Sequence, residues 1–327
     1  MNRRLGGLLM AVAAGLLWGL SGTAAQWLMQ HGGLRPTGLV VFRMGSSGPL
    51  LLAAVALGAR IRRRGSRRGL PPAVLLVAPW RARGDRWRLL LFSLFGFAAV
   101  QATYLAAIDA GNAATATFLQ YLAPGVVVLW EAWRERRLPE PRFQAALALG
   151  LAGTFLLATG GGSAFALTPA ALAWGLLSAL ALAFYTVYPA PLLTRYGTPL
   201  VTGWAMAAGA LALLPWTPAE APLWVRALAS GESWAVAGLL AFVAVGGTLV
   251  PFTLYLASLR SLKPSETSLA ASVEPLAATL AAGLWLGVRL SPLQELGAAA
   301  VLAMVVLVTR TRAAGAPERP AGDAGVA

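Results

Sequence analysis

The chain has 327 residues, of which 58% are hydrophobic and only 12% are charged. Soluble domains carry about a quarter charged residues, so this composition excludes the water-soluble classes. Cysteine is absent and histidine occurs once, at His31, which excludes disulfide scaffolds, thiol nucleophiles and sites built on several histidines or cysteines. We therefore expect no metal, no cofactor and no enzymatic activity. The class that remains is a protein embedded in a membrane.

Uncharged segments long enough to cross a bilayer recur along the chain. A membrane-spanning helix needs about 20 mostly apolar residues, and cutting the sequence at its charges yields ten such helices. The run 143–194 is long enough for two of them, with the turn expected at 160–163. The expected spans are 5–30, 36–59, 89–108, 110–130, two within 143–194, 196–219, 233–259, 267–288 and 291–309. The sequence thus predicts an all-α polytopic membrane protein.

The basic residues alternate with these spans. If the N-terminus faces the cytoplasm, 22 lysines and arginines lie in inner segments and three lie in outer loops. Because cytoplasmic loops are enriched in basic residues, we expect both termini in the cytoplasm and the protein in the cytoplasmic membrane. This bias accounts for the net charge of +14, so no nucleic-acid partner is expected. The basic loop 58–88 should contact lipid headgroups, and its segment 70–80 is too short to span and should lie at the interface.

The two halves of the chain resemble each other. The segment TYLAAIDAGNAATATFLQYLAP (103–124) overlays LYLASLRSLKPSETSLAASVEP (254–275) at an offset of 151 residues, and 17–32 overlays 182–197 at an offset of 165. Five helices per copy is an odd number, so the second copy must be inverted in the membrane. Such folds bind their substrate near the midplane, between the repeats. The expected parts are a cytoplasmic N-terminus at 1–4, repeats at 5–162 and 168–310, and a disordered cytoplasmic tail at 311–327.

Polar residues share one face of two matching helices, the fourth and the ninth. Polar groups in lipid are costly, so we interpret these two faces as the lining of one central cavity. The alternative is that small and polar residues only let the helices pack closely. The prolines of these faces should break the helices, and Leu119 and Leu269 should face lipid. The residues concerned are Thr117, Gln120, Tyr121 and Pro124 in the first copy and Ser268, Ser272 and Pro275 in the second.

Two charged residues and five aromatic residues also lie inside the expected spans. A carboxylate in a span must face water, pair with a cation or carry a proton, so Glu274 is either a coupling residue that exchanges protons or the ion-pair partner of Arg43. Arg43 lies about 9 Å into its helix and could instead contact an anionic substrate or extend to the outer surface. The aromatic residues, which line a pocket or merely pack, are Trp18, Tyr104, Tyr185, Tyr188 and Tyr255.

Three segments carry a family resemblance. LLWGLSGTAAQWL (16–28), NAATATFLQYLAP (112–124) and SETSLAASVEPL (265–276) resemble the EamA family of the drug/metabolite transporter superfamily. The resemblance implies a ten-helix, two-repeat inner-membrane carrier. It also implies transport, because many members of the family export amino acids or other metabolites. Members usually follow the fourth and ninth helices with a Gly-Glu-Arg-Leu-like segment. This chain keeps the acid at Glu135 but has Val288 in the second copy, which argues against a symmetric pair of carboxylates.

The sequence therefore predicts a transporter, and more specifically an exporter, of small metabolites such as amino acids that works by alternating access. Proton coupling through Glu274 is a hypothesis. Two alternatives stay open: a lipid-linked-sugar flippase of the same superfamily, and a membrane-embedded lipid-modifying enzyme, for which no cluster of reactive groups is visible. The expected partners are the substrate, protons and the lipid bilayer. The sequence leaves open the substrate, the direction, the coupling ion and the oligomeric state, including a homodimer.

Overall fold

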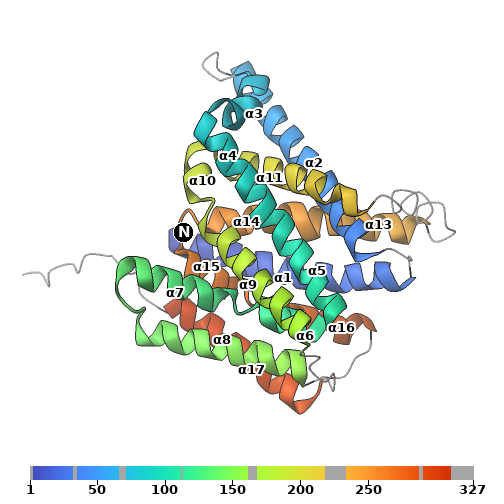
Figure 1. Cartoon of the computed structure of the whole chain (residues 1–327), viewed down its shortest axis with the longest axis vertical. Helices are drawn as coiled ribbons and strands as arrows, with labels where there is room; N and C mark the ends of the chain where they lie inside the picture. The colour runs from blue at the N-terminus through green and yellow to red at the C-terminus, as the bar shows by residue number, and fades with distance from the viewer. Residues whose placement is uncertain are drawn as a thin grey trace, which may run out of the picture.

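The structure, a computed structural model, describes residues 3–31, 35–65, 71–111, 113–160, 168–217, 233–286 and 290–310. These residues form helices and short connections, with no strand among them (Figure 1). The turn expected after Gly160, the position of Val288 and the tail expected at 311–327 lie outside the described residues, as does the side chain of His31.

The first half of the chain carries one short helix, α3, after its second long helix, and α3 covers the segment expected at the membrane interface. The next element, α4, continues through η1 into α5 as one helical segment, Arg83–Ala110. Trp204 holds α3 in place, because its indole nitrogen donates a hydrogen bond of 2.8 Å to the Leu76 carbonyl oxygen. The elements are α1 (Arg3–His31), α2 (Pro36–Gly65), α3 (Pro72–Arg81), α4 (Arg83–Leu91), the π-helix η1 (Phe92–Ala98), α5 (Ala99–Ala110), α6 (Ala113–Gln120), α7 (Ala123–Glu135) and α8 (Pro141–Thr159).

The second half repeats this order of long helices. It also contains a π-helix, η3, at a position that matches η1: the two end at Ala98 and Leu249, which are 151 residues apart. The elements are α9 (Pro169–Val187), α10 (Ala190–Tyr196), α11 (Thr198–Leu213), the 3₁₀ turn η2 (Leu214–Trp216), α13 (Ser233–Ala244), η3 (Val245–Leu249), α14 (Val250–Ser258), α15 (Pro264–Ala271), α16 (Glu274–Leu286) and α17 (Pro292–Arg310).

Nine helical segments within the described residues are long and apolar enough to cross a membrane. They correspond to nine of the ten expected spans. The expected fourth span is divided between α6, with 8 residues, and α7, with 13, so neither reaches the length of a span alone. The exact count of ten and the orientation of the termini therefore stay predictions.

The fourth and ninth helices of the expected scheme break at matching residues. In the first half α6 ends at Gln120 and α7 begins at Ala123, and in the second half α15 ends at Ala271 and α16 begins at Glu274. Both pairs are separated by 151 residues. Each break is followed by a proline, which has no N–H group to donate to the preceding turn. Each proline therefore leaves one backbone carbonyl oxygen of the preceding turn without its usual helical donor.

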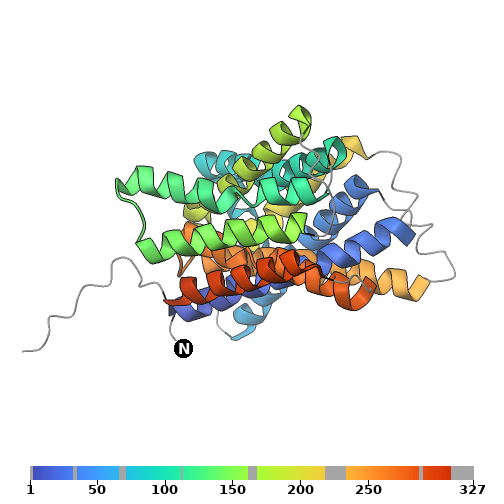
Figure 2. The same ribbon diagram turned by 90° about the horizontal axis from the view of Figure 1, so that it is seen from below.

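The two halves pack against each other in a reciprocal pattern. From the first half, α1 lies against α14, α15 and α16; from the second half, α9 lies against η1, α5, α6 and α7. The helix α2 packs along α11, and α8 packs along α17, as Figures 1 and 2 show. The main core consequently lies between the halves, so neither half folds around a core of its own.

Two glycines allow α1 to approach the second helix break closely. A Cβ atom at Gly15 would overlap the carbonyl oxygen of Ala271, and one at Gly19 would lie 2.6 Å from the carbonyl oxygen of Glu274. Glycines four residues apart on one helix face are the usual means by which membrane helices bring their backbones together. This contact fixes the position of α1 beside the break between α15 and α16.

Leu119 and Leu269 are buried, with 4% and 1% of their surfaces exposed, so the expectation that they face lipid is wrong. Leu119 packs over Gly175 of α9, and Leu269 packs beside Gly150 of α8. The expectation fails because α6 and α15 are enclosed. The helix α15, for example, is surrounded by α1, α7, α9, α14 and α17.

Candidate functional site

The two helix breaks meet each other directly. Tyr121 lies in the break between α6 and α7, and Glu274 is the first residue of α16, after the other break. The Tyr121 hydroxyl donates a hydrogen bond of 2.5 Å to a carboxylate oxygen of Glu274. A side chain from the first half thus holds the carboxylate of the second half at the centre of the reciprocal contact.

Arg43 lies near Glu274 but does not contact it. Its guanidinium donates a hydrogen bond of 2.5 Å to the side-chain oxygen of Gln101. Gln101 lies on α5, which is continuous with η1. Among the described residues no nitrogen of Arg43 lies within 4 Å of a carboxylate oxygen, although the Arg43 charge is close enough to act on Glu274 electrostatically. The Nε atom of Arg43 is buried and has no hydrogen-bond partner among the described residues. The proposed ion pair is therefore absent from this conformation.

Equivalent tyrosines of the two halves make similar hydrogen bonds. Tyr104 of α5 shares one of 2.9 Å with Thr117 of α6. Tyr255, 151 residues later on α14, shares one of 2.7 Å with Thr186 of α9. Tyr104 therefore attaches the third expected span to the broken fourth span, whereas Tyr255 attaches the eighth expected span to α9.

Gln120 and Ser272, the other polar residues of the matching faces, make different contacts. The side-chain amide of Gln120 donates a hydrogen bond of 2.8 Å to Ser178 of α9. The Ser272 hydroxyl donates one of 3.1 Å to the carbonyl oxygen of Ser268 within its own helix. Gln120 thus links the halves, whereas Ser272 satisfies a backbone group beside the break.

Aromatic rings pack beside these polar groups. The Trp18 ring centroid lies 4.9 Å from that of Phe252 and 5.3 Å from that of Tyr255, and the Tyr185 and Tyr255 centroids are 5.7 Å apart. The Trp18 indole nitrogen and the Tyr185 hydroxyl are buried without a hydrogen-bond partner among the described residues. Tyr188, in contrast, stacks on Phe184 at 4.4 Å. Four of the five expected aromatic residues therefore lie in or beside the polar cluster.

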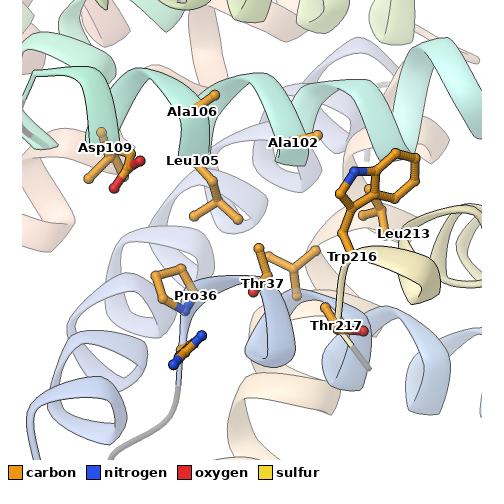
Figure 3. Close-up of a pocket in the computed structure, with 12 residues that line it drawn as sticks. Pro36, Thr37, Ala102, Leu105, Ala106, Asp109, Leu213, Trp216 and Thr217 are labelled. Atoms are coloured by element: carbon orange, nitrogen blue, oxygen red, sulfur yellow. The ribbon is translucent and has the colours of Figure 1, made fainter. Parts of the chain in front are cut away.

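A cavity of about 570 Å³ opens where α1 ends, between α2, α5 and α11 (Figure 3). Thr37 and Val40 of α2 line it together with Ala102 and Leu105 of α5, and Trp216 and Asp109 lie at its sides. Arg43 follows Val40 by three residues on α2, and Gln101 immediately precedes Ala102 on α5. One helical turn advances about 5.4 Å, so the Arg43–Gln101 pair lies within one turn of the residues that line this cavity.

Sequence reasoning missed three residues of this cluster: Gln101, Ser178 and Thr186. The sequence could have indicated Gln101, because it is a polar amide inside an expected span, three residues before Tyr104. The cost of burying a polar group in a membrane applies to it as it does to Gln120. Ser178 and Thr186 had none, because small hydroxyl residues are common in membrane helices for packing alone.

Comparison with known proteins identifies the family. The model of the EamA-like transporter family matches residues 5–159 and 169–310. The chain belongs to this family. An uncharacterized inner membrane transporter of Salmonella typhimurium, YicL, is 35% identical over 308 residues, which cover 93% of this EamA-like chain and 95% of that protein. An uncharacterized transporter of Archaeoglobus fulgidus is 29% identical over 228 residues, which cover 70% of this chain and 78% of that transporter.

One solved crystal structure has the same fold. Its TM-score is 0.72, and the match covers 93% of this chain and 96% of that one, at 20% sequence identity. The family and the names of the two relatives indicate a multi-pass transporter of the cell membrane rather than an enzyme. They imply a small-molecule substrate and a lipid environment.

Proposed function

We propose that this EamA-like protein exports small amphipathic metabolites of the amino-acid type, and that Arg43 and Glu274 bind the two charged groups of the substrate. The observation that carries this proposal is that two opposite charges lie near each other at the interface of the halves without pairing. Each charge instead has a neutral partner, Gln101 for Arg43 and Tyr121 for Glu274.

Unused hydrogen-bonding capacity supports this assignment. The Arg43 Nε atom is a buried donor without a partner among the described residues, and such groups carry a free-energy penalty of about 1–3 kcal/mol until an acceptor arrives. A substrate carboxylate satisfies this donor, and a substrate ammonium group neutralises Glu274. The aromatic rings of Trp18, Tyr185 and Tyr255 provide an apolar surface for the rest of the molecule. A zwitterion with an apolar side chain matches all three features.

Alternating access between inverted repeats is the proposed mechanism. Matching helix breaks, matching π-helices and the reciprocal packing support two repeats at 5–162 and 168–310, related by a pseudo-twofold axis. The proposal places both termini in the cytoplasm and the cavity next to Arg35 on the outer side. It assigns proton coupling to Glu274, since a carboxylate shared between the halves can release its proton when the substrate ammonium group binds.

A thermal-shift measurement on purified protein tests the substrate class. We expect at least one L-amino acid with an apolar side chain, such as phenylalanine, to raise the melting temperature. Phenethylamine and 3-phenylpropanoate each lack one charged group and should give much smaller shifts, because each leaves Arg43 or Glu274 without its partner. Equal shifts with the single-charge analogues would contradict the role of both residues, and the absence of any shift across the amino acids would contradict the substrate class.

A further inference from the structure

Ion pairs gather at one end of the molecule. The four ion pairs between described residues all lie where α1, α4 and α15 begin and where α7 and α10 end. Along the continuous helix Arg83–Ala110, Asp85 lies near the beginning, whereas the residues that line the cavity of Figure 3 lie between Ala102 and Asp109. We call the end with the ion pairs the inner end. The pairs are Arg4–Glu266 at 2.7 Å, Lys263–Glu135 at 2.7 Å, Arg195–Asp85 at 2.6 Å and Arg88–Asp85 at 3.6 Å.

Two carboxylates of α7 hold the beginning of α15. Both oxygens of Glu135 accept hydrogen bonds from the Lys263 ammonium group, at 2.7 and 2.8 Å. One turn earlier, Glu131 accepts hydrogen bonds from the backbone nitrogen of Ser265 at 3.0 Å and from its hydroxyl at 2.5 Å. A carboxylate at the first turn of a helix is stabilised by the unpaired N–H groups and the helix dipole there. Glu131 therefore attaches α7 to α15 at a favourable site.

Arg4 connects the same end of α15 to two more helices. Its guanidinium donates to Glu266 at 2.7 Å and to the carbonyl oxygens of Val308 and Thr309 at 3.0 and 3.3 Å. These carbonyls belong to the last turn of α17, where a cation is favoured. The Arg4 and Glu266 side chains are only 17% and 12% exposed, so solvent screens this pair less than an ordinary surface pair.

These contacts join α1 and α7 of the first half to α15 and α17 of the second. We call the six residues that make them the inner latch: Arg4, Glu131, Glu135, Lys263, Ser265 and Glu266. Behind them, every residue of α15 from Ser265 to Ala271 is buried. The polar cluster is thus covered from the inner end, while the cavity above Arg43 opens at the other end. We propose that the inner latch is a conformational gate that holds the outward-open state and must break for the inner end to open.

The latch has no charged counterpart in the other repeat. The residues 151 positions before Lys263, Ser265 and Glu266 are Asn112, Ala114 and Thr115, and those 151 positions after Glu131 and Glu135 are Ala282 and Leu286. The residue 165 positions after Arg4 is Pro169. All four ion pairs between described residues lie at the inner end. The balance between the two states is therefore sensitive to these six residues, which have no matching set of charges at the equivalent sequence positions of the other repeat.

Cysteine accessibility in nanodiscs, where both faces of the protein meet the solvent, tests the gate. The chain has no cysteine, so a single introduced cysteine reports on one end alone. Val128→Cys reports on the inner end, since Val128 lies behind the latch and is 8% exposed. Thr37→Cys reports on the outer cavity. We expect Glu135→Gln combined with Glu266→Gln to raise the maleimide reaction rate at Val128→Cys about three- to tenfold and to lower it at Thr37→Cys, since loss of such pairs shifts a two-state equilibrium by this order.

Two controls make the result specific. Glu140→Gln removes an exposed carboxylate at the same end that has no ion pair among the described residues, so it should leave both rates unchanged. Exchanging the charges, with Glu135→Lys and Lys263→Glu, should preserve the original rates. An unchanged rate at Val128→Cys in the double variant would overturn the gate, and rates rising together at both positions would show general loosening instead. The gate rests on the proposed transport function, but labelling needs no substrate, so the two proposals fail independently.

Discussion

At the scale of single residues, Glu274 differs from Asp85, Glu135 and Glu266 because they form ion pairs, whereas its hydrogen-bond donor among the described residues is a neutral hydroxyl group. Tyr121 donates to it, and the charge of Arg43 acts on it without contact. A structural ion pair would hold the two halves together, but a carboxylate with a neutral hydrogen-bond donor can gain or lose a proton without separating them. The geometry therefore favours the coupling hypothesis over the pairing hypothesis for Glu274.

Replacement of Glu274 by glutamine separates these hypotheses. Glu274→Gln keeps the size of the side chain but removes both its titration and the charge proposed to bind the substrate ammonium group. We therefore expect a folded protein that exchanges substrate passively only at higher substrate concentrations and loses transport driven by a pH gradient. Proteoliposomes measured with and without the gradient give both quantities. Glu295→Gln, the same change at an exposed residue of α17, serves as the matched control. Undiminished pH-driven transport by Glu274→Gln would contradict coupling, and strong destabilisation that Arg43→Gln relieves would support pairing.

At the scale of helices, the contact between α1 and the second break depends on glycine. Gly19 faces the backbone of α16, whereas Gly22, on the same helix, has no atom within 4 Å of the place where a Cβ would lie. These two positions separate the steric role of glycine from its lower helix propensity. They also test whether the packing of α1 stabilises the break between α15 and α16.

Alanine at these positions should have opposite effects. Gly19→Ala places a methyl group 2.6 Å from the Glu274 carbonyl oxygen and 2.7 Å from the Ala278 nitrogen, so we expect it to lower stability by about 1–3 kcal/mol. Gly22→Ala should be neutral or stabilising by up to about 1 kcal/mol, because alanine favours the helix. Thermal unfolding of the purified variants measures the difference. Equal stabilities of the two variants would show that α1 does not need this close approach.

Periodicity predicted the helices better than it predicted what surrounds them. The apolar runs and the prolines at positions 124 and 275 carry local information, and local physical rules place the spans and the breaks from them. The burial of Leu119 and Leu269 depends on how many helices enclose α6 and α15, which hydropathy along one helix does not encode. Likewise, the pairing of Arg43 with Gln101 instead of Glu274 is decided by tertiary distances of a few ångströms.

At the scale of the whole molecule, the two ends differ in chemistry although the halves share a fold. The described ion pairs lie at the inner end, and the cavity opens at the outer end. The basic residues follow the same division in the sequence, with 22 expected inside and three outside. The two ends differ whichever way the chain is oriented, but the compartment assigned to each end depends on one expectation, that α1 begins in the cytoplasm.

Labelling of intact cells tests that orientation with exposed residues from each end. Leu138, between α7 and α8, is 75% exposed, and Trp216, at the end of α11, is 73% exposed. We expect Trp216→Cys to react with a membrane-impermeant maleimide in intact cells, and Leu138→Cys to react only after the membrane is opened, since the positive-inside bias places Leu138 in the cytoplasm. The cysteine-free parent controls for background labelling. The opposite pattern would reverse both the proposed direction of export and the side on which the ionic gate lies, because the latch and the cavity would then exchange compartments.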